Sequence, residues 1–221
     1  MTRNFESISV ERLFENIPEE LAALFSGVTY PWEVLPNIRK YILEYLPKAG
    51  LTEILPDVYA APDARIAKGA EIVGPTVIMS GAEIRHGAYI RGAAFIGRGA
   101  IVGNSTEVKN ALLFDGANAP HYNYVGDSVL GCRAHMGAGA VASNLKSVGG
   151  SVTVHLGSGI DTGLRKFGAI LGDSADVGCG CVLNPGTVVG RGSIIYPLTS
   201  VRGVVPEGVI MKGQNSFSKR I

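Results

Sequence analysis

Aliphatic residues recur at every sixth position along most of the chain. A period of six fits neither an amphipathic helix nor a long alternating strand. It fits short parallel strands joined by turns, of which three complete one coil of a prism. The first run of this pattern consists of Ile66, Ile72, Ile78, Ile84, Ile90, Ile96, Val102, Val108 and Phe114, and a later run consists of Leu171, Val177, Leu183, Val189, Ile195 and Val201.

These residues are predicted to point into the prism and to stack on their equivalents one coil later. Each buried aliphatic side chain stabilises the fold by roughly 1.5–3 kcal/mol, so the ladder forms the core. Gly-Ala pairs such as Gly69-Ala70 and Gly99-Ala100 mark the corners, because Gly reaches backbone angles that other residues avoid. The pattern predicts an all-β chain, a parallel β-helix of hexapeptide repeats, over residues 51–207.

Residues 1–50 have a different pattern. Apolar residues between Leu13 and Phe25, and again between Val34 and Tyr45, recur at helical spacing. We expect a helical N-terminal region of two or three short helices over 1–50. A packing cap or an oligomer contact is the favoured role, and a regulatory or partner-binding role is the alternative.

The six-residue period fails in two places. Pro120 occupies the position that follows Phe114, and Pro cannot donate a ladder hydrogen bond. The period resumes with Leu130 and Met136 and is lost again after Asn144. Residues from about 145 to 169 are too many for one repeat, so we expect an excursion with a hairpin-like element at 151–155. Residues 208–221 are predicted to form a polar C-terminal tail.

Composition narrows the function classes. The net charge of +1 gives no electrostatic reason to expect nucleic acid or an acidic membrane surface as a partner. Three cysteines without framework spacing argue against a disulfide scaffold. There is no apolar stretch of signal-peptide or membrane-spanning type. We therefore expect a soluble, cytoplasmic protein.

The first break in the repeat carries the best candidate for catalysis. In a repeat fold, function concentrates where the repeat is violated. His121 lies there, followed by Tyr122, Asn123 and Tyr124. An isolated His is often structural, but a His also titrates near neutral pH and can accept a proton from an attacking amine or hydroxyl. His121 is thus a candidate general base.

Three stretches, in this order along the chain, carry a specific resemblance. They are Arg91–Lys109, Pro120–Asp127 and Met136–Asn144. They resemble the hexapeptide-repeat acyltransferases, and in particular the acetyltransferase domain of the bifunctional N-acetylglucosamine-1-phosphate uridyltransferases. Ser143-Asn-Leu, the excursion and the stretch after Asp161 look closest to the archaeal-type sugar-1-phosphate nucleotidyltransferases. The resemblance covers about residues 60–205 and implies a left-handed parallel β-helix, a homotrimer and acetyl-CoA as co-substrate.

The resemblance also implies roles for single residues. It implies that His121 deprotonates the amine of glucosamine 1-phosphate and that the backbone N–H of Ala138 stabilises the oxyanion. Arg91 and Lys109 would bind the phosphate, since a forked and a point-like cation suit a dianion. Residues implied to contact the sugar are Tyr124 and Asn144, and those implied to lie along acetyl-CoA are Ala138, Cys179, Pro197 and Lys212.

Two departures from the family pattern stand out. His135 replaces an Asn, and it either contacts the substrate or couples electrostatically to His121. The loop after Asn144 normally carries lysines, whereas here only Lys146 is near, and Arg165 and Lys166 would have to fold back to replace them. No Gly-rich nucleotide loop precedes the repeats, so we do not expect this chain to make a nucleotide sugar.

Two other functions compete with acetyl transfer. A metal-dependent hydratase would need three His ligands around one zinc ion. The four histidines are not closely paired in sequence, so we expect no metal site. The second alternative is a non-catalytic trimeric β-helix that binds a sugar nucleotide or a protein partner.

Overall fold

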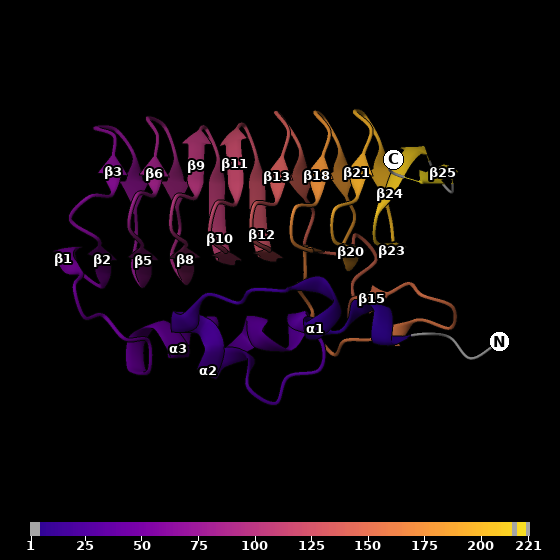
Figure 1. The fold of residues 1–221 in the computed structure, drawn as a ribbon, viewed down its shortest axis with the longest axis horizontal. Coiled ribbons are helices and arrows are strands. Elements are labelled where there is room, and N and C mark those ends of the chain that lie inside the picture. The colour runs from indigo at the N-terminus through magenta and orange to yellow at the C-terminus, as the bar shows by residue number, and fades with distance from the viewer. Residues whose placement is uncertain (1–4, 214–215, 220–221) are drawn as a thin grey trace.

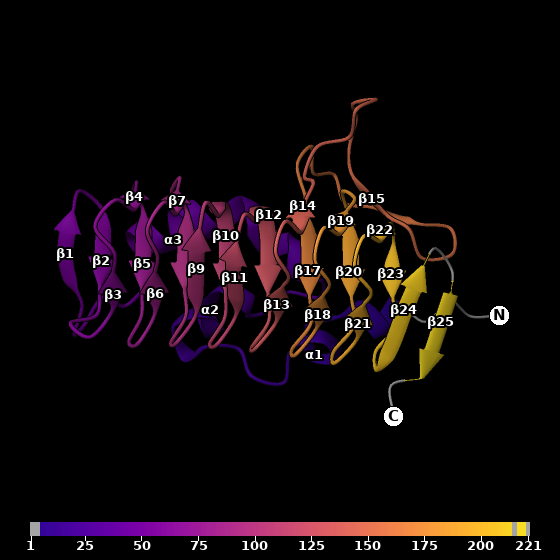
Figure 2. The ribbon, with the colours of Figure 1, turned by 90° about the horizontal axis from the view of Figure 1, so that it is seen from above.

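The structure of the protein, a computed structural model, describes residues 5–213 and 216–219. Short parallel strands stack into a prism with three faces, and the chain advances along the prism from N to C (Figures 1 and 2). The predicted left-handed parallel β-helix is confirmed. Among the described residues, no helix combines the length and the apolar character needed to span a bilayer.

Each face is a row of equivalent strands. Face 1 contains β2 (Val58–Ala60), β5 (Thr76–Ile78), β8 (Ala94–Ile96), the second halves of β10 (Glu107–Leu113) and β12 (Tyr124–Leu130), β17 (Ala169–Leu171), β20 (Thr187–Val189) and β23 (Val204–Val205). Face 2 contains β3 (Arg65–Ile66), β6 (Glu83–Ile84), β9 (Ile101–Asn104), β11 (Asn118–His121), β13 (His135–Met136), β18 (Asp176–Val177), β21 (Ile194–Ile195) and β24 (Val209–Gly213). Face 3 contains β4 (Glu71–Ile72), β7 (Tyr89–Ile90), the first halves of β10 and β12, β14 (Val141–Ala142), β19 (Val182–Leu183) and β22 (Ser200–Val201).

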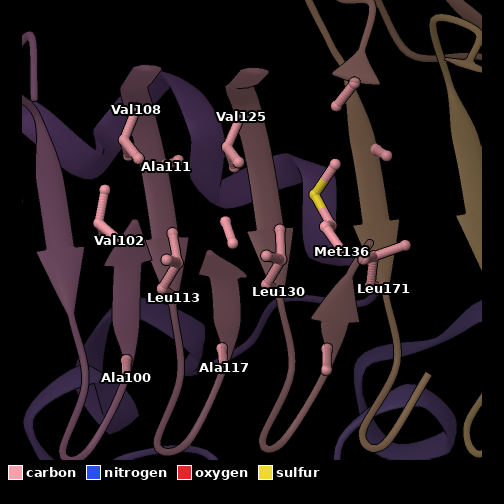
Figure 3. Close-up of a cluster of buried hydrophobic side chains, with 14 of the residues drawn as sticks. Ala100, Val102, Val108, Ala111, Leu113, Ala117, Val125, Leu130, Met136 and Leu171 are labelled. Carbon is pink, nitrogen blue, oxygen red and sulfur yellow. The ribbon is translucent and has the colours of Figure 1, made fainter. Parts of the chain in front are cut away.

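The inside of the prism is a dry stack of aliphatic side chains. Figure 3 shows its middle coils, where Val102, Val108, Leu113 and Val125 point inward and are fully buried. Close packing of this kind, rather than any single contact, holds the coils together.

The prediction for Phe114 is wrong by one residue. Ile84 pairs with Val102, which lies 18 residues on, but Val102 pairs with Ala119, only 17 residues on. One residue is missing at the corner within β10, where Asn110 adopts a left-handed φ of 47°. Consequently Leu113 fills the inside, and Phe114 packs in a separate cluster outside the prism.

The same omission recurs one coil later. Asp127 takes the corner with a φ of 48°, and Leu113 pairs with Leu130, again 17 residues on. Ala119, not Pro120, occupies the inward position at the first break. The period therefore does not stop at the break but shifts its phase twice.

The N-terminal region runs along face 1 (Figure 1). It consists of α1 (Val10–Leu13), α2 (Ala22–Phe25) and α3 (Ile38–Glu44) with the 3₁₀ helices η1 (Phe5–Ile8), η2 (Glu19–Leu21) and η3 (Pro31–Asn37). Phe14 and Phe25 pack on Phe114, with ring centroids 4.9 and 5.8 Å apart. Asp173 accepts hydrogen bonds from the backbone N–H groups of Glu15 and Cys132, both at 2.8 Å. These contacts fix the region on the prism.

The excursion leaves the corner between face 3 and face 1 and returns to it. It contains an antiparallel hairpin of β15 (Thr153–Val154) and β16 (Ile160–Asp161), as the alternation predicted. Its two ends lie side by side through a bridge between Leu145 and Lys166. It projects beyond the prism near β14, β19 and β22 (Figure 2).

The two ends of the prism are closed by antiparallel strands. β1 (Thr52–Leu55) pairs with β2, and β25 (Ser216–Lys219) pairs with β24. β24 lies in the region expected to be a tail, but it continues face 2 by pairing with β21, and Met211 is buried. Residues 1–4 of the expected N-terminal region, and 214–215 and 220–221 of the expected tail, lie outside the described residues.

Candidate functional site

His121 lies at the corner where face 2 turns into face 3. Its strand neighbour on the preceding coil is Asn104, and the equivalent positions on the following coils are Ala138, Cys179 and Pro197. We call this row of corner residues the histidine edge. The structure thus places the predicted base, the predicted oxyanion donor and two predicted acetyl-CoA contacts on one line along the prism.

Asn123 holds the corner in shape. It is 3% exposed, and its Oδ1 accepts a hydrogen bond of 3.0 Å from the backbone N–H of His121. Its Nδ2 donates to the carbonyl oxygens of Gly137 at 2.8 Å and Ala140 at 3.0 Å. One buried amide therefore ties the His121 corner to the Ala138 corner. The His121 side chain remains exposed.

Ala138 follows His121 on the next coil. The backbone N–H of Gly139 donates to the carbonyl oxygen of His121 at 3.0 Å, so the two corners lie one strand spacing apart, about 4.8 Å. Within the described part of the chain, the N–H of Ala138 meets no hydrogen-bond acceptor. It is an exposed donor on the same edge as the imidazole, as an oxyanion site requires.

Arg91 and Lys109 lie on the opposite corner, where face 3 turns into face 1. They are equivalent positions on adjacent coils, because Ile90 pairs with Val108. We call this row, which continues with Gly126, Ser143, Asn184 and Arg202, the arginine edge. Within one chain, the predicted phosphate ligands and His121 are thus separated by the width of face 3.

Arg91 is not a free cation in this structure. Its guanidinium donates to Glu107 Oε1 at 2.6 Å, and this carboxylate raises the pKa of Arg91. The pair is solvent-exposed, so it contributes little to stability. A phosphate at Arg91 has to compete with the Glu107 carboxylate.

Tyr124 and Asn144 meet on the outside of face 3, close to the arginine edge. Asn144 Nδ2 donates to the Tyr124 hydroxyl at 3.1 Å and to Asp127 Oδ2 at 2.5 Å. Asn110 Nδ2 donates to the other Asp127 oxygen at 2.8 Å. Burial, and then the carboxylates of Glu107 and Asp127, raise the pKa of Tyr124. The Tyr124 ring lies over Gly126, where a Cβ would collide with its hydroxyl.

His135 does not lie on either edge. It projects from face 2, where its Nδ1 lies 2.8 Å from Asp176 Oδ1 on the next coil. The imidazole is therefore oriented by Asp176 and belongs to the flat of face 2, before the chain reaches the corner of Ala138.

The predicted acetyl-CoA contacts continue the histidine edge toward the C-terminal coils. Cys179 and Pro197 are exposed there. Lys212 follows β24's buried Met211, and its Nζ lies 5.9 Å from the centre of the Tyr196 ring. Cys179 and Pro197 offer a thiol and an apolar surface on this edge. Lys212, equivalent to Tyr196 on the preceding coil, offers a cation one position before the edge.

The excursion brings its basic residues back to its start. The bridge between Leu145 and Lys166 places the backbone of Lys166 beside the segment that contains Lys146. Arg165 and Lys166 are exposed, while Lys146 is half-buried and its Nζ donates to the carbonyl oxygen of Ser151 at 2.8 Å.

Sequence reasoning assigned no role to three polar residues that shape this surface, namely Glu107, Asn123 and Asp127. A signal existed for Asp127, since it takes a corner at which a residue is missing, and Asp tolerates the left-handed conformation better than most residues.

The described residues contain no group of three His, Cys, Asp or Glu side chains arranged to hold a metal ion.

The chain is similar to known proteins over its central part. The family model described as the GMPPB C-terminal domain matches residues 72–162. The bifunctional sugar-1-phosphate nucleotidylyltransferase/acetyltransferase of Sulfurisphaera tokodaii is 36% identical over 109 residues, which cover 49% of this chain and 27% of that protein. The bifunctional protein GlmU of Methanococcus vannielii is 35% identical over 91 residues, which cover 41% and 22%. The chain therefore spans only about a quarter of these relatives' length.

The chain is also similar to two solved structures of acetyltransferases. The acetyltransferase domain of PglB from Neisseria gonorrhoeae, in complex with acetyl coenzyme A, covers 74% of this chain and 57% of that chain at 18% identity, with a TM-score of 0.35. A histidine-to-alanine mutant of GDP-perosamine N-acetyl transferase from Caulobacter crescentus, in complex with CoA and GDP-perosamine, covers 73% and 55% at 17% identity, also with a TM-score of 0.35.

The predicted resemblance is confirmed by these sequence matches. The match to the family model, over residues 72–162, includes Arg91, Lys109, His121 and Asn144. Over 41–49% of its length, the chain is similar to bifunctional nucleotidyltransferase/acetyltransferases of the GlmU type.

Proposed function

We propose that this chain transfers the acetyl group of acetyl-CoA to the amine of an amino-sugar phosphate, with glucosamine 1-phosphate as the first substrate to test. The observation that carries the proposal is the pairing of two groups on one edge. An exposed imidazole and an unengaged backbone N–H lie on adjacent coils, at His121 and Ala138.

In the proposed reaction, the sugar amine attacks the thioester carbonyl. His121 accepts the proton that the nitrogen loses as the N–C bond forms. The N–H of Ala138 donates to the carbonyl oxygen while it carries negative charge. The C–S bond then breaks, the carbonyl reforms, and the coenzyme thiolate takes the proton, so that an amide and free CoA leave.

The two edges divide the substrates in this proposal. Acetyl-CoA lies along the histidine edge past Cys179 and Pro197 toward Lys212. The acceptor lies against face 3, with its sugar at Tyr124 and Asn144, while Arg91 and Lys109 hold its phosphate. His135, which projects from face 2, is assigned to contact with the substrate of a neighbouring subunit.

We also propose that the protein is a homotrimer in the cytoplasm. In a trimer packed around an axis parallel to the prism, the histidine edge of one chain can face the arginine edge of another. The mass in solution, measured by light scattering, tests this assembly. A monomer with full activity would contradict a site shared between chains.

Release of free thiol, coupled to a chromogenic disulfide, tests the reaction. The wild-type protein is expected to release thiol with glucosamine 1-phosphate and acetyl-CoA. His121→Ala is expected to lower kcat by about 10²–10⁴-fold, as for the loss of a general base. His86→Ala is the matched control, because His86 is exposed on the same edge two coils earlier. Thiol release that His121→Ala leaves unchanged would overturn the proposed mechanism.

One observation favours a second function, a non-catalytic β-helix that binds a sugar nucleotide or a protein partner. Arg91 is already paired with Glu107, so the phosphate position is occupied by the chain's own carboxylate. Binding of an amino-sugar phosphate without thiol release from any acetyl-CoA mixture would support this function and reject acetyl transfer.

A further inference from the structure

A cavity of about 220 Å³ lies where the excursion leans against the C-terminal part of the arginine edge. Its walls come from three places: the start of the excursion, the hairpin, and the corners of two coils. The residues that matter chemically are Lys146 and His155 from the excursion, Arg202 and Asn184 from the corners, and the hydroxyl groups of Ser143 and Thr153.

The polar groups of this cavity are cationic or neutral. None of its lining residues is an Asp or a Glu. Arg202 Nη2 lies 3.0 Å from His155 Nε2, so the arginine donates and the imidazole nitrogen accepts. Burial, and then the nearby charges of Arg202 and Lys146, lower the pKa of His155. The Asp161 carboxylate interacts electrostatically with Lys146. It is exposed and accepts a hydrogen bond from the N–H of Gly163 at 3.1 Å.

The hairpin packs tightly against the prism and so forms one wall of the cavity. Val152 and Val154 are fully buried in the cluster outside the prism. Gly203 and Gly186, both with left-handed φ, let the hairpin backbone approach the corners. A Cβ at Gly203 would lie 2.6 Å from the carbonyl oxygen of His155, and one at Gly186 would lie 2.9 Å from that of Thr153. A side chain at either position would push the hairpin away.

The cavity is distinct from the phosphate position proposed above. Along the arginine edge, Lys109, Gly126, Ser143, Asn184 and Arg202 occupy successive coils. With a strand spacing of about 4.8 Å, Arg202 lies about 19 Å along the prism from Lys109. One phosphate group cannot contact both residues.

We propose that this cavity binds the phosphate group of a small phosphomonoester, held by Arg202, Lys146 and His155. A guanidinium and an ammonium suit a dianion, and the volume has room for a phosphate with a small substituent but not for a coenzyme. The site does not depend on acetyl transfer, because it lies about 19 Å along the arginine edge from Lys109, where the acceptor phosphate is proposed to bind.

The two cations beside His155 are expected to make the affinity of the cavity for a dianion depend on pH. In the absence of a ligand, Arg202 and Lys146 oppose the protonation of His155. A bound dianion takes the Arg202 donor in place of His155 Nε2, reverses the local field and so favours a proton on this nitrogen. Binding is therefore expected to take up a proton, and the affinity for a dianion of fixed charge is expected to rise as the pH falls. The exposed Asp161 carboxylate, whose charge interacts with that of Lys146, stays ionised between pH 6 and pH 8 because its pKa is lowered.

Calorimetric titration with glucose 1-phosphate tests the site, since this sugar has no amine to acetylate. The wild-type protein is expected to bind two molecules per chain. Arg91→Gln with Lys109→Gln is expected to remove one of them, and Lys146→Gln with Arg202→Gln is expected to weaken the other at least tenfold. Melting temperatures of both double variants check that each remains folded. Unchanged stoichiometry and affinity in the Lys146–Arg202 variant would overturn the proposal.

Sulfate, a dianion at every pH used, provides the second measurement. We expect the wild-type protein to bind sulfate several-fold more tightly at pH 6 than at pH 8, and His155→Gln to lose most of this difference. A pH dependence that His155→Gln leaves intact would reject the role of His155 in the pocket. A protein that acetylates glucosamine 1-phosphate yet binds one glucose 1-phosphate, lost with Arg91 and Lys109, would support the acetyltransferase and exclude the second site.

Discussion

Face 1 and face 3 of the prism share one backbone ladder but differ in what covers them. Each strand of both faces presents one side chain that points outward between the two corners. On face 1 these side chains are apolar, and the N-terminal region and the excursion bury them. On face 3 they are mixed and stay at least partly exposed. The face 1 row contains Val77, Phe95, Leu112, Val129, Ile170 and Val188, and the face 3 row contains Tyr89, Glu107, Tyr124, Val141, Val182 and Ser200.

The difference shows that the repeat determines only the inside of the prism. The outward position is free of that constraint, so its residue type decides whether a face becomes scaffold or surface. An apolar row needs a partner, and here residues 8–46 and the excursion supply it within the same chain. The uncovered face 3 lies between the histidine edge and the arginine edge, where the chemistry is proposed.

The largest expected effect comes from breaking the cover of face 1. Phe114→Ala removes the ring on which Phe14 and Phe25 pack, in a fully buried position. We expect the free energy of unfolding to fall by about 3–5 kcal/mol. Val182→Ala, on the exposed row of face 3, is the control and should change it by less than about 0.5 kcal/mol. Urea denaturation measures both values, and equal losses would show that the faces do not differ in this way.

Covered and uncovered parts of the prism should also differ in the reactivity of their cysteines. Burial under the N-terminal region raises the pKa of Cys132 to about 11, so at pH 8 about one thiol in a thousand is ionised. Cys179 is exposed on the histidine edge. Iodoacetamide and peptide mapping should label Cys179 in the native protein and Cys132 only after denaturation. Phe114→Ala, which loosens the cover, should accelerate labelling of Cys132. Rapid native labelling of Cys132 would contradict a stable cover.

Protection of Cys179 by CoA sharpens the same experiment. If the coenzyme lies along the histidine edge, saturating CoA should slow the labelling of Cys179. Labelling that CoA does not slow would move the coenzyme away from this edge.

The sequence was sufficient for the fold because the ladder is a local, repeated signal. Ile and Val at every sixth position can be counted without knowledge of contacts. The prediction failed at Phe114 because one residue is missing at the Asn110 corner, which shifts the phase. A shift of one position is hard to detect in the sequence, because Leu113 and Phe114 are both apolar. A packing role was favoured for residues 1–50, but the face that they cover was not predicted, although the apolar Phe95 and Leu112, each beside a ladder residue, carried that signal.

The candidate site residues could be named from the sequence, but the contacts between them could not. Spacing and resemblance led to His121 and Ala138, which the structure places on adjacent coils. Spacing and resemblance did not reveal that Arg91 forms an ion pair with Glu107, because this pair joins neighbouring coils. The cavity at Arg202 was also hidden, because the path of a long excursion depends on contacts such as that between Val152 and the prism.

Asn123→Ala would break the link between the His121 and Ala138 corners. It removes an acceptor from the N–H of His121 and donors from two carbonyl oxygens. We expect a loss of about 1–3 kcal/mol in stability and a lower kcat with little change in KM. Asn123→Asp keeps the acceptor for His121 and loses the donors, so it should retain more activity per folded molecule than Asn123→Ala. Thermal melting and thiol release on the same samples separate the two effects.

The smallest expected effect concerns the competition at Arg91. Glu107→Gln removes the carboxylate that pairs with the guanidinium, and because the pair is exposed, stability should change by less than about 0.5 kcal/mol. The freed Arg91 should bind the acceptor phosphate better, so KM for glucosamine 1-phosphate should fall several-fold at unchanged kcat. Glu71→Gln is the matched control, since Glu71 lies two coils earlier in the same row of face 3. If KM rises instead, Glu107 contacts the acceptor directly, and the open face 3 binds its substrate through a carboxylate as well as through the two cations.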